Sequence, residues 1–208
     1  MKRLIIIPTY NESANVSVIV QRIFKHIPNT EVLIIDDGSP DGTAQIVESL
    51  QSNFSGLHLL KRAKKSGLGS AYRTGFAWAL ERRYDEIVEM DADLSHRVRD
   101  LSRMIAKKES APQAALIIGS RWIKGGETEN WSISREILSR TANLYVRLML
   151  GMGVKDSTAG FRLYSAAILS KIDLDSIKSE GYSYQIEMTR AVHELGGTII
   201  RSEEHTSE

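Results

Sequence analysis

The chain has 208 residues, a formal net charge of +1 and no cysteine. Its length and its composition, 42% hydrophobic and 25% charged, are those of one soluble globular domain with a sizeable core. The lack of cysteine excludes disulfides, thiolate metal sites and cysteine nucleophiles, and the balanced charge gives no general attraction for nucleic acid. No apolar run approaches the roughly 20 residues of a membrane span, and the run at residues 4–7 is too short for a signal peptide.

The first 90 residues alternate between short apolar runs and segments with helical periodicity. The apolar runs predict strands at residues 4–7, 32–35, 57–60 and 86–90. Apolar residues at helical spacing predict a helix between each strand and the next, with a basic loop at residues 61–69 before the third helix. This order of elements predicts βαβ units and therefore an α/β fold with a mostly parallel sheet.

The second half of the chain is less regular. Residues 115–118 predict a fifth strand, and residues 134–150 predict an amphipathic helix. Residues 156–162 are polar and contain glycine, which is typical of a turn. A further helix is expected at residues 184–195, and a last strand begins at residue 198.

Two carboxylates, Asp91 and Asp93, follow the fourth predicted strand. In extended backbone, residues i and i+2 point to the same side, so both carboxylates can converge on one point while Ala92 faces away. Two such carboxylates repel each other unless a cation lies between them, and a hard divalent ion such as Mg²⁺ or Mn²⁺ prefers oxygen ligands. The alternative for an isolated Asp-x-Asp is an acidic turn in which Asp93 caps the next helix.

Polar residues follow three of the predicted strands, at residues 8–12, 36–39 and 91–96. Ligands of open α/β sheets bind at the carboxyl ends of the strands. Because these ends meet at one edge of a parallel sheet, the acid and amide groups gather there. This arrangement favours a functional interpretation of Asp91 and Asp93.

Seven motifs resemble, in order, those of inverting glycosyltransferases of family 2, and more narrowly those of the dolichyl-phosphate or polyprenyl-phosphate mannose synthases. They read PTYNE at 8–12, DDGSPDGT at 36–43, GLG-x-AY at 67–72, MDADLSH at 90–96, GSR at 119–121, TAGFR at 158–162 and GYSYQIE at 181–187. Together they span about residues 2–200. The first four indicate a glycosyltransferase, and the last three favour the polyprenyl-phosphate branch.

The resemblance implies the GT-A fold, in which a Rossmann-like, mostly parallel sheet is flanked by helices. It implies a single catalytic domain at residues 1–201, whereas residues 202–208 do not match and are expected to form a disordered tail. Family members continue past the last strand into a basic segment that helps to close over the nucleotide. A partner subunit or a further C-terminal membrane segment is therefore also expected of the parent protein.

The resemblance further assigns a nucleotide-sugar site. In such a site an aromatic side chain stacks on the base, and carboxylates accept hydrogen bonds from the ribose or the base. The residues expected to bind the nucleotide sugar are Pro8, Tyr10, Glu12, Asp37, Lys65, Gly69, Asp91, Ala92 and Asp93.

The resemblance also implies that Asp91 and Asp93 are catalytic and hold Mg²⁺ or Mn²⁺. The metal would bridge the diphosphate and neutralise the charge that develops on the leaving group. The position of a further family ligand is occupied by Ser95, a weaker ligand than an amide or a carboxylate. The family also tends to have a proline just after His96, where this chain has Arg97 and Val98. This departure and Ser95 both concern the detail of the metal site.

The implied acceptor is a phosphate monoester, which is already anionic at pH 7, so no general base is demanded. Arg121, with a catalytic role, and Arg135 and Ser139 match the positions expected to bind the acceptor phosphate. Arginine suits this task because its planar fork binds phosphate through two hydrogen bonds. The alternative for Arg121 is a surface salt bridge.

Three other polar residues in the motifs have two interpretations. His96 is either a phosphate contact or a turn residue. Gln185 and Glu187 lie at i and i+2, on different faces of the predicted helix, so a site role for one of them competes with a capping or core role.

The implied function is metal-dependent transfer of mannose from GDP-mannose to a polyprenyl (dolichyl) phosphate, with the protein peripheral at the cytoplasmic face of a membrane. Trp122 and Trp131, among the arginines of residues 119–147, are expected to meet the membrane surface. An alternative donor is UDP-glucose or another UDP-sugar. An alternative of another class is an inactive nucleotide-sugar-binding module that lacks the C-terminal segment.

Overall fold

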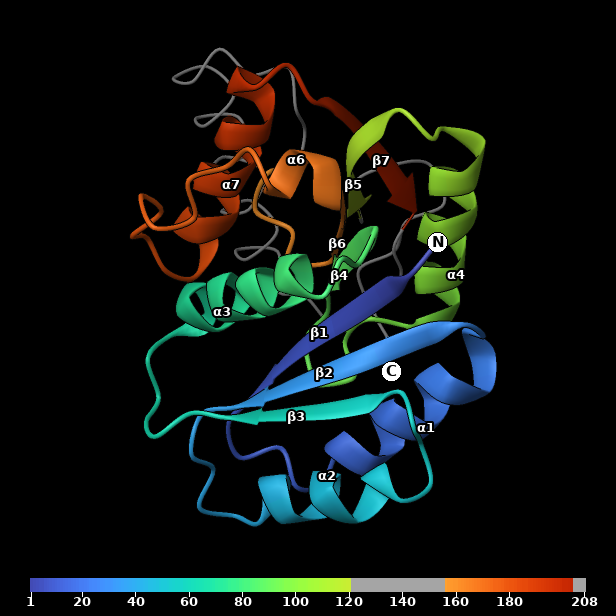
Figure 1. The fold of residues 1–208 in the computed structure, drawn as a ribbon, viewed down its shortest axis with the longest axis vertical. Coiled ribbons are helices and arrows are strands. Elements are labelled where there is room, and N and C mark those ends of the chain that lie inside the picture. Colours follow the sequence, from blue (N-terminus) through green and yellow to red (C-terminus); the bar gives the residue numbers. More distant parts are fainter. Residues whose placement is uncertain (121–155, 204–208) are drawn as a thin grey trace, which may run out of the picture.

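The structure, a computed structural model, describes residues 1–120 and 156–203. In these residues seven strands form one sheet in the order β3-β2-β1-β4-β6-β5-β7 (Figure 1). The strands are β1 (Arg3–Thr9), β2 (Thr30–Asp36), β3 (Leu57–Lys61), β4 (Glu86–Glu89), β5 (Ala114–Ser120), β6 (Arg162–Ser165) and β7 (Thr198–Glu203). The helices are α1 (Val16–His26), α2 (Thr43–Gln51), α3 (Leu68–Glu81), α4 (Val98–Ser110), α6 (Ala166–Leu169) and α7 (Tyr182–Glu194).

All described strands except β6 point the same way. β1 is parallel to β2 and β4, and β2 is parallel to β3. β6 is antiparallel to both β4 and β5, so β5 has the direction of β4, and β7 is parallel to β5. The carboxyl ends of the parallel strands therefore share one edge with the start of β6, and this edge positions the candidate site.

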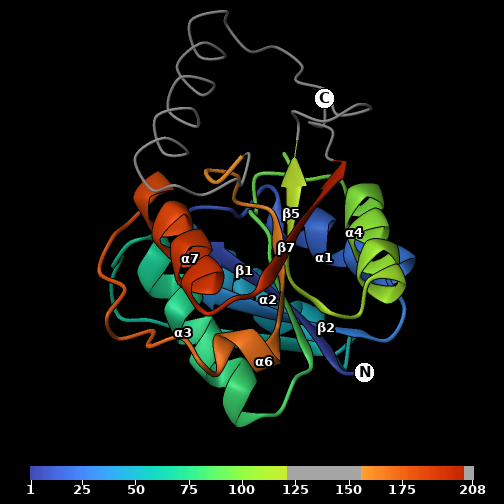
Figure 2. The same ribbon diagram turned by 90° about the horizontal axis from the view of Figure 1, so that it is seen from above.

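Helices cover both faces of the sheet. α1, α2 and α4 pack on one face, and α3, α6 and α7 pack on the other (Figures 1 and 2). Along β1, Ile5 and Ile7 contribute to the first core, whereas Leu4 and Ile6 contribute to the second. A strand that is covered on both faces must be apolar at every position, which explains the continuous apolar run at residues 4–7.

The predicted strands and the first three predicted helices are confirmed, and so is the mostly parallel sheet. Three elements were not predicted. α4 has buried apolar residues at helical spacing, at Val98, Leu101 and Ile105, so its signal was present in the sequence. β6 and α6 span only four residues each, too few for a period to show.

Two expectations concern the ends of the described ranges. The amphipathic helix expected at residues 134–150 lies outside the described residues. β7 runs to Glu203 and pairs with β5 through Ser202, so residues 202 and 203, which the sequence alone assigns to the tail, belong to the sheet. Within the part that the structure describes, no helix has both the length and the apolar character needed to cross a membrane.

Candidate active site

The three polar strand ends meet at the carboxyl edge of the sheet, as the sequence predicts. The backbone N–H of Asn11 donates to Ser39 Oγ at 3.0 Å, which joins the segments after β1 and β2. The hydroxyl of Tyr72, from α3, donates to Asp91 Oδ1 at 3.2 Å and so connects α3 to the segment after β4. Residues far apart in the sequence thus line one edge.

Asp91 is held by buried neighbours, although its own side chain is 36% exposed. His96 Nε2 lies 3.2 Å from Asp91 Oδ2, and the His96 ring stacks on Phe161 with centroids 4.6 Å apart. His96 is buried, so it contacts the carboxylate from the protein side. Tyr72 and His96 therefore fix the orientation of Asp91, as groups behind a metal ligand commonly do.

Asp93 lies on the surface in a tight turn. Its Oδ1 accepts a hydrogen bond from the backbone N–H of Ser95 at 3.0 Å, and Leu94 between them has a positive φ of 63°. Ala92 is buried, whereas Asp91 is partly exposed and Asp93 is exposed. Asp93 does not cap α4, because that helix begins at Val98 with Arg97 at its N-cap.

The donor set around this turn suits a hard cation. Asp91 and Asp93 offer only oxygen atoms, and no cluster of three or more His, Cys, Asp or Glu side chains occurs in the described ranges. Mg²⁺ is typically bound by one or two carboxylates together with substrate phosphates, rather than by an all-protein cage. The residues present therefore fit a divalent ion that shares its ligands with a diphosphate.

The segments expected to bind the nucleotide have specific partners. Tyr10 is 38% exposed, and Lys65 Nζ lies 4.2 Å from its ring centroid. The Asp37 carboxylate is bound at both oxygens by Arg62, with Nε–Oδ1 at 2.6 Å and Nη2–Oδ2 at 2.7 Å. Arg62 was missed by sequence reasoning, because only the parallel pairing of β2 with β3 brings residue 62 beside residue 37. Pro8 is half-buried at the same edge.

Glu12 and Gly69 each sit at the start of a helix. Glu12 Oε2 accepts from the Asn15 amide at 2.9 Å, and its carbonyl accepts the backbone N–H groups that begin α1. The backbone N–H of Gly69, in the first turn of α3, donates to Glu180 Oε2 at 2.7 Å. Glu180 was also missed, and it pairs with the backbone N–H of Gly69, one of the residues expected to bind the nucleotide sugar.

A buried polar cluster lies behind Asp91. Glu89, the last residue of β4, accepts a hydrogen bond from the Tyr184 hydroxyl at 3.1 Å. Burial raises the pKa of Glu89 to about 7, although the Arg162 guanidinium and the nearby Gln185 amide lower it. Arg162 is fully buried and donates to the carbonyls of Ala159 and Ser157, both at 2.6 Å. It thereby fixes the loop that precedes β6.

The residues expected to bind the acceptor phosphate, Arg121, Arg135 and Ser139, lie outside the described residues, as do Trp122 and Trp131. The described neighbour of this segment, Ser120, donates from its hydroxyl to Asp156 Oδ2 at 2.8 Å. β5 has the same direction as β4 and therefore ends at the same edge as Asp91.

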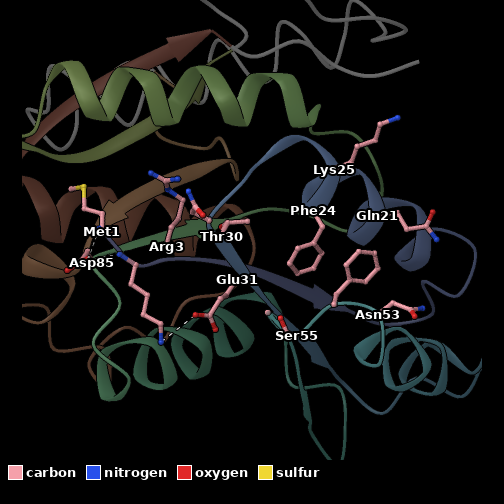
Figure 3. Close-up of a pocket in the computed structure, with 14 residues that line it drawn as sticks. Met1, Arg3, Gln21, Phe24, Lys25, Thr30, Glu31, Asn53, Ser55 and Asp85 are labelled. Carbon is pink, nitrogen blue, oxygen red and sulfur yellow. Dashed lines mark hydrogen bonds and ion pairs between the residues drawn. The ribbon is translucent and has the colours of Figure 1, made fainter.

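A wide hollow of about 1240 Å³ lies at the opposite edge of the sheet (Figure 3). It is lined by residues at the amino-terminal ends of β1 and β2, such as Arg3 and Thr30, and by the stacked pair Phe24 and Phe54. It includes none of the predicted site residues. Because ligands of parallel α/β sheets bind at the carboxyl ends of the strands, the candidate site remains at the Asp91 edge.

Comparisons with protein families and with curated proteins also point to a glycosyltransferase. A family model described as glycosyl transferase family 2 matches residues 4–173. The chain is 44% identical over 200 residues to an undecaprenyl-phosphate mannosyltransferase of Micrococcus luteus, with 96% of this chain and 81% of that protein covered. It is 45% identical over 200 residues to a polyprenol monophosphomannose synthase of Mycolicibacterium smegmatis, with 96% and 75% covered.

Solved structures share the fold at low sequence identity. A glucosyl-3-phosphoglycerate synthase from Mycobacterium tuberculosis, in complex with Mn²⁺ and UDP, superposes with a TM-score of 0.73 at 17% identity, covering 100% of this chain and 71% of that one. A mannosyltransferase from Pyrobaculum calidifontis, in complex with GDP-Man and Mn²⁺, superposes with a TM-score of 0.63 at 17% identity, covering 97% and 56%. These similarities confirm the expected GT-A fold.

Proposed function

The chain belongs to glycosyl transferase family 2, and from this membership we propose that it transfers mannose from GDP-mannose to a polyprenyl phosphate. Two curated relatives at 44% and 45% identity, both named for mannose transfer to a polyprenol carrier, support this substrate pair. The observation that carries the proposal is the Asp91–Asp93 turn at the carboxyl edge of the sheet, beside the segments after β1 and β2.

Each part of the site has a task in this reaction. Tyr10 stacks on the base, and Asp37, held by Arg62, accepts a hydrogen bond from the nucleoside. Asp91 and Asp93, with Ser95 as a weak third ligand, would hold Mg²⁺ or Mn²⁺. When bound, this ion supplies Lewis-acid neutralisation of the diphosphate. Tyr72 and His96 keep the Asp91 carboxylate in place.

The acceptor phosphate is bound by residues of the segment that follows β5. Arg121, Arg135 and Ser139 position the acceptor phosphate by charge and hydrogen bonding. One phosphate oxygen forms a bond to the anomeric carbon, the bond from that carbon to the diphosphate oxygen breaks, and the configuration inverts. The nucleophile is already anionic, so no proton has to leave it during the step.

The acceptor has a lipid tail, so transfer takes place at a bilayer surface. Trp122 and Trp131 are residues of the type that prefers the membrane interface, and the arginines near them are attracted to anionic headgroups. We therefore place the protein at the cytoplasmic face of a membrane, as a peripheral enzyme.

A donor panel tests the proposal. The chain is incubated with a short-chain polyprenyl phosphate, Mn²⁺ or Mg²⁺ and either GDP-mannose or UDP-glucose, and products are identified by mass spectrometry. We expect a mannosylated lipid phosphate from GDP-mannose alone. A product from UDP-glucose would establish the alternative donor, and nucleotide binding without product from either donor would establish a binding module.

A further inference from the structure

Gln185, in the first turn of α7, has a buried carboxamide whose hydrogen-bonding capacity is not met. The residue is 2% exposed, and neither Nε2 nor Oε1 has a partner at normal hydrogen-bond geometry, although the amide lies close enough to the Glu89 carboxyl to lower its pKa. Native proteins pair the great majority of their buried polar side-chain atoms, so a carboxamide with both atoms unpaired calls for an explanation.

The carboxamide faces a space beside the candidate metal ligand. A Cβ atom built on Gly160 would lie 3.6 Å from Asp91 Oδ2 and 4.0 Å from Gln185 Nε2, with no other described atom within 4 Å. The backbone of Gly160 does not have a positive φ, so its conformation does not require glycine. The absence of a side chain therefore leaves room between Asp91 and Gln185, and Gly160 itself is only half-buried.

This space has a rigid wall. Arg162 is fully buried and holds the carbonyls of Ala159 and Ser157, which precede Gly160 and fix its loop. The same guanidinium donates to the backbone carbonyl of Gln185 at 3.0 Å. One side chain thus fixes both the loop on one side of the space and the backbone of α7 on the other.

The chemistry of a carboxamide selects the group that fits. Nε2 can only donate and Oε1 can only accept, so a single group that pairs both must itself donate and accept. A hydroxyl does so, whereas a phosphate oxygen only accepts, and a cation is repelled by Nε2–H. Building on the proposed function, we propose that Gln185 hydrogen-bonds a hydroxyl of the transferred sugar, in the space that Gly160 leaves beside Asp91, and so determines sugar specificity.

A purely structural role is the competing explanation. Glu89 Oε2 is also buried without a partner, and the Gln185 amide is near enough to influence the Glu89 carboxyl. If Gln185 served to pair Glu89, its loss would weaken the fold. If instead the carboxamide pairs only with a bound sugar hydroxyl, its removal would raise the stability of the ligand-free protein, because a buried polar group that lacks a good partner is removed.

The test uses Gln185→Met, which keeps the length of the side chain and removes its hydrogen-bonding atoms. Binding of GDP and of GDP-mannose, each with Mn²⁺, is measured by calorimetry, and Tm is measured without ligand. We expect at least a tenfold rise in the Kd for GDP-mannose, a change of less than twofold for GDP, and a higher Tm. Gly160→Ala should weaken GDP-mannose in the same selective way by filling the space. Gln21→Met, on the exposed side of α1, is the matched control and should change none of these values.

Three results would overturn the inference. They are a lower Tm for Gln185→Met, equal losses of GDP and GDP-mannose affinity, and unchanged affinity for both. If the wild-type chain prefers UDP-glucose, the donor in the proposed function is wrong, and the same variants are compared with UDP and UDP-glucose to judge Gln185 separately. Wild-type protein that binds none of the four nucleotides would overturn both proposals.

Discussion

The Asp91 carboxylate is oriented by two side chains that local sequence patterns do not connect to it. Tyr72 reaches Oδ1 from α3, and His96 reaches Oδ2 from the turn before α4. Burial raises the pKa of the Tyr72 hydroxyl well above its usual range, and the charge of Asp91 raises it further. The hydroxyl therefore stays protonated and donates to Asp91 throughout the physiological pH range.

Replacing Tyr72 by phenylalanine removes this hydrogen bond and little else. Because groups behind a metal ligand commonly change metal affinity by about 10- to 100-fold, we expect Tyr72→Phe to weaken Mn²⁺ binding in the presence of GDP by about tenfold. Electron paramagnetic resonance of free Mn²⁺ measures this directly. Tyr182→Phe, at a 67% exposed position of α7, is the control. Equal Mn²⁺ affinity in the two variants would show that Tyr72 does not support the proposed metal site.

Glu89 gives a prediction about pH. Its folded pKa of about 7 lies above the ordinary value of 4.5, chiefly because the carboxyl is buried. Between these values the folded state holds a proton that the unfolded state has released, so stability falls as pH rises. The contribution is fully present below pH 4.5 and is lost by about pH 7, which amounts to about 3 kcal/mol in the free energy of unfolding.

Glu89→Gln should remove this dependence, because the amide does not titrate and can still accept the Tyr184 hydroxyl. Urea unfolding in EDTA at pH 5, 6, 7 and 8 provides the comparison. The wild-type free energy of unfolding should drop over this range relative to that of the variant. Glu194→Gln, on the exposed side of α7, should follow the wild type. Parallel curves for wild type and Glu89→Gln would contradict the raised pKa.

At the scale of elements, α3 begins on a carboxylate supplied by a distant segment. Glu180, just before α7, accepts the backbone N–H groups of Gly69 at 2.7 Å and Ser70 at 3.0 Å. A negative charge at a helix N-terminus satisfies otherwise unpaired N–H groups and opposes the helix dipole. This contact ties the start of α7 to the start of α3 on the same face of the sheet.

Removing the Glu180 charge should loosen this junction. We expect Glu180→Gln to lower the free energy of unfolding by no more than about 1 kcal/mol, since the side chain is 41% exposed. Amide exchange at Gly69 and Ser70 should become faster. Glu109→Gln on the exposed side of α4 should change neither quantity. Unchanged exchange at both amides in Glu180→Gln would show that the carboxylate does not hold the helix.

Gly67, at the start of α3, is the position that faces Glu180 in this junction. Its φ is +95°, and an added Cβ would collide with the Glu180 carboxylate. Gly67→Ala should therefore destabilise the fold more than Glu180→Gln does. Combining Gly67→Ala with Glu180→Ala should be less harmful than the sum of the two single changes, because the collision disappears. Additive effects in urea unfolding would argue against direct contact.

At the scale of the whole molecule, the short strand β6 decides the shape of the site. It runs antiparallel between β4 and β5, and so places the loop before it at the carboxyl edge of the parallel strands. Gly160 in that loop faces Asp91 for this reason, and Phe161 stacks on His96. This edge of the sheet is therefore built by both halves of the chain.

β7 covers the edge of β5 and makes the second half of the sheet complete. A chain ending at residue 197 would leave the N–H and C=O groups of β5 exposed along one side and would lack Ile199 and Ile200, which pack on the two cores. We expect this truncation to lower Tm and to promote association through the open edge. Size-exclusion chromatography with light scattering compares it with the full chain. A monomeric truncation with unchanged Tm would contradict a structural role for β7.

The sequence by itself determined every described strand except β6, most of the described helices and the position of the two carboxylates at the end of β4. A strand covered on both faces must be apolar throughout, so runs such as residues 32–35 are visible without any tertiary information. The Asp-x-Asp pair after β4 is likewise visible in the sequence, and the alternation of predicted strands and helices places it at one edge with the other polar strand ends.

The tertiary structure alone decided which individual side chains contact one another at the site. Arg62 meets Asp37 because β3 is parallel to β2, and Glu180 meets Gly69 across 111 positions of the chain. Gln185 and Gly160 face each other because β6 reverses direction beside β4. Hydrophobic periodicity reports which face of an element is buried, but it holds no information about which distant element packs there. That choice follows from strand order and direction, which are properties of the whole sheet.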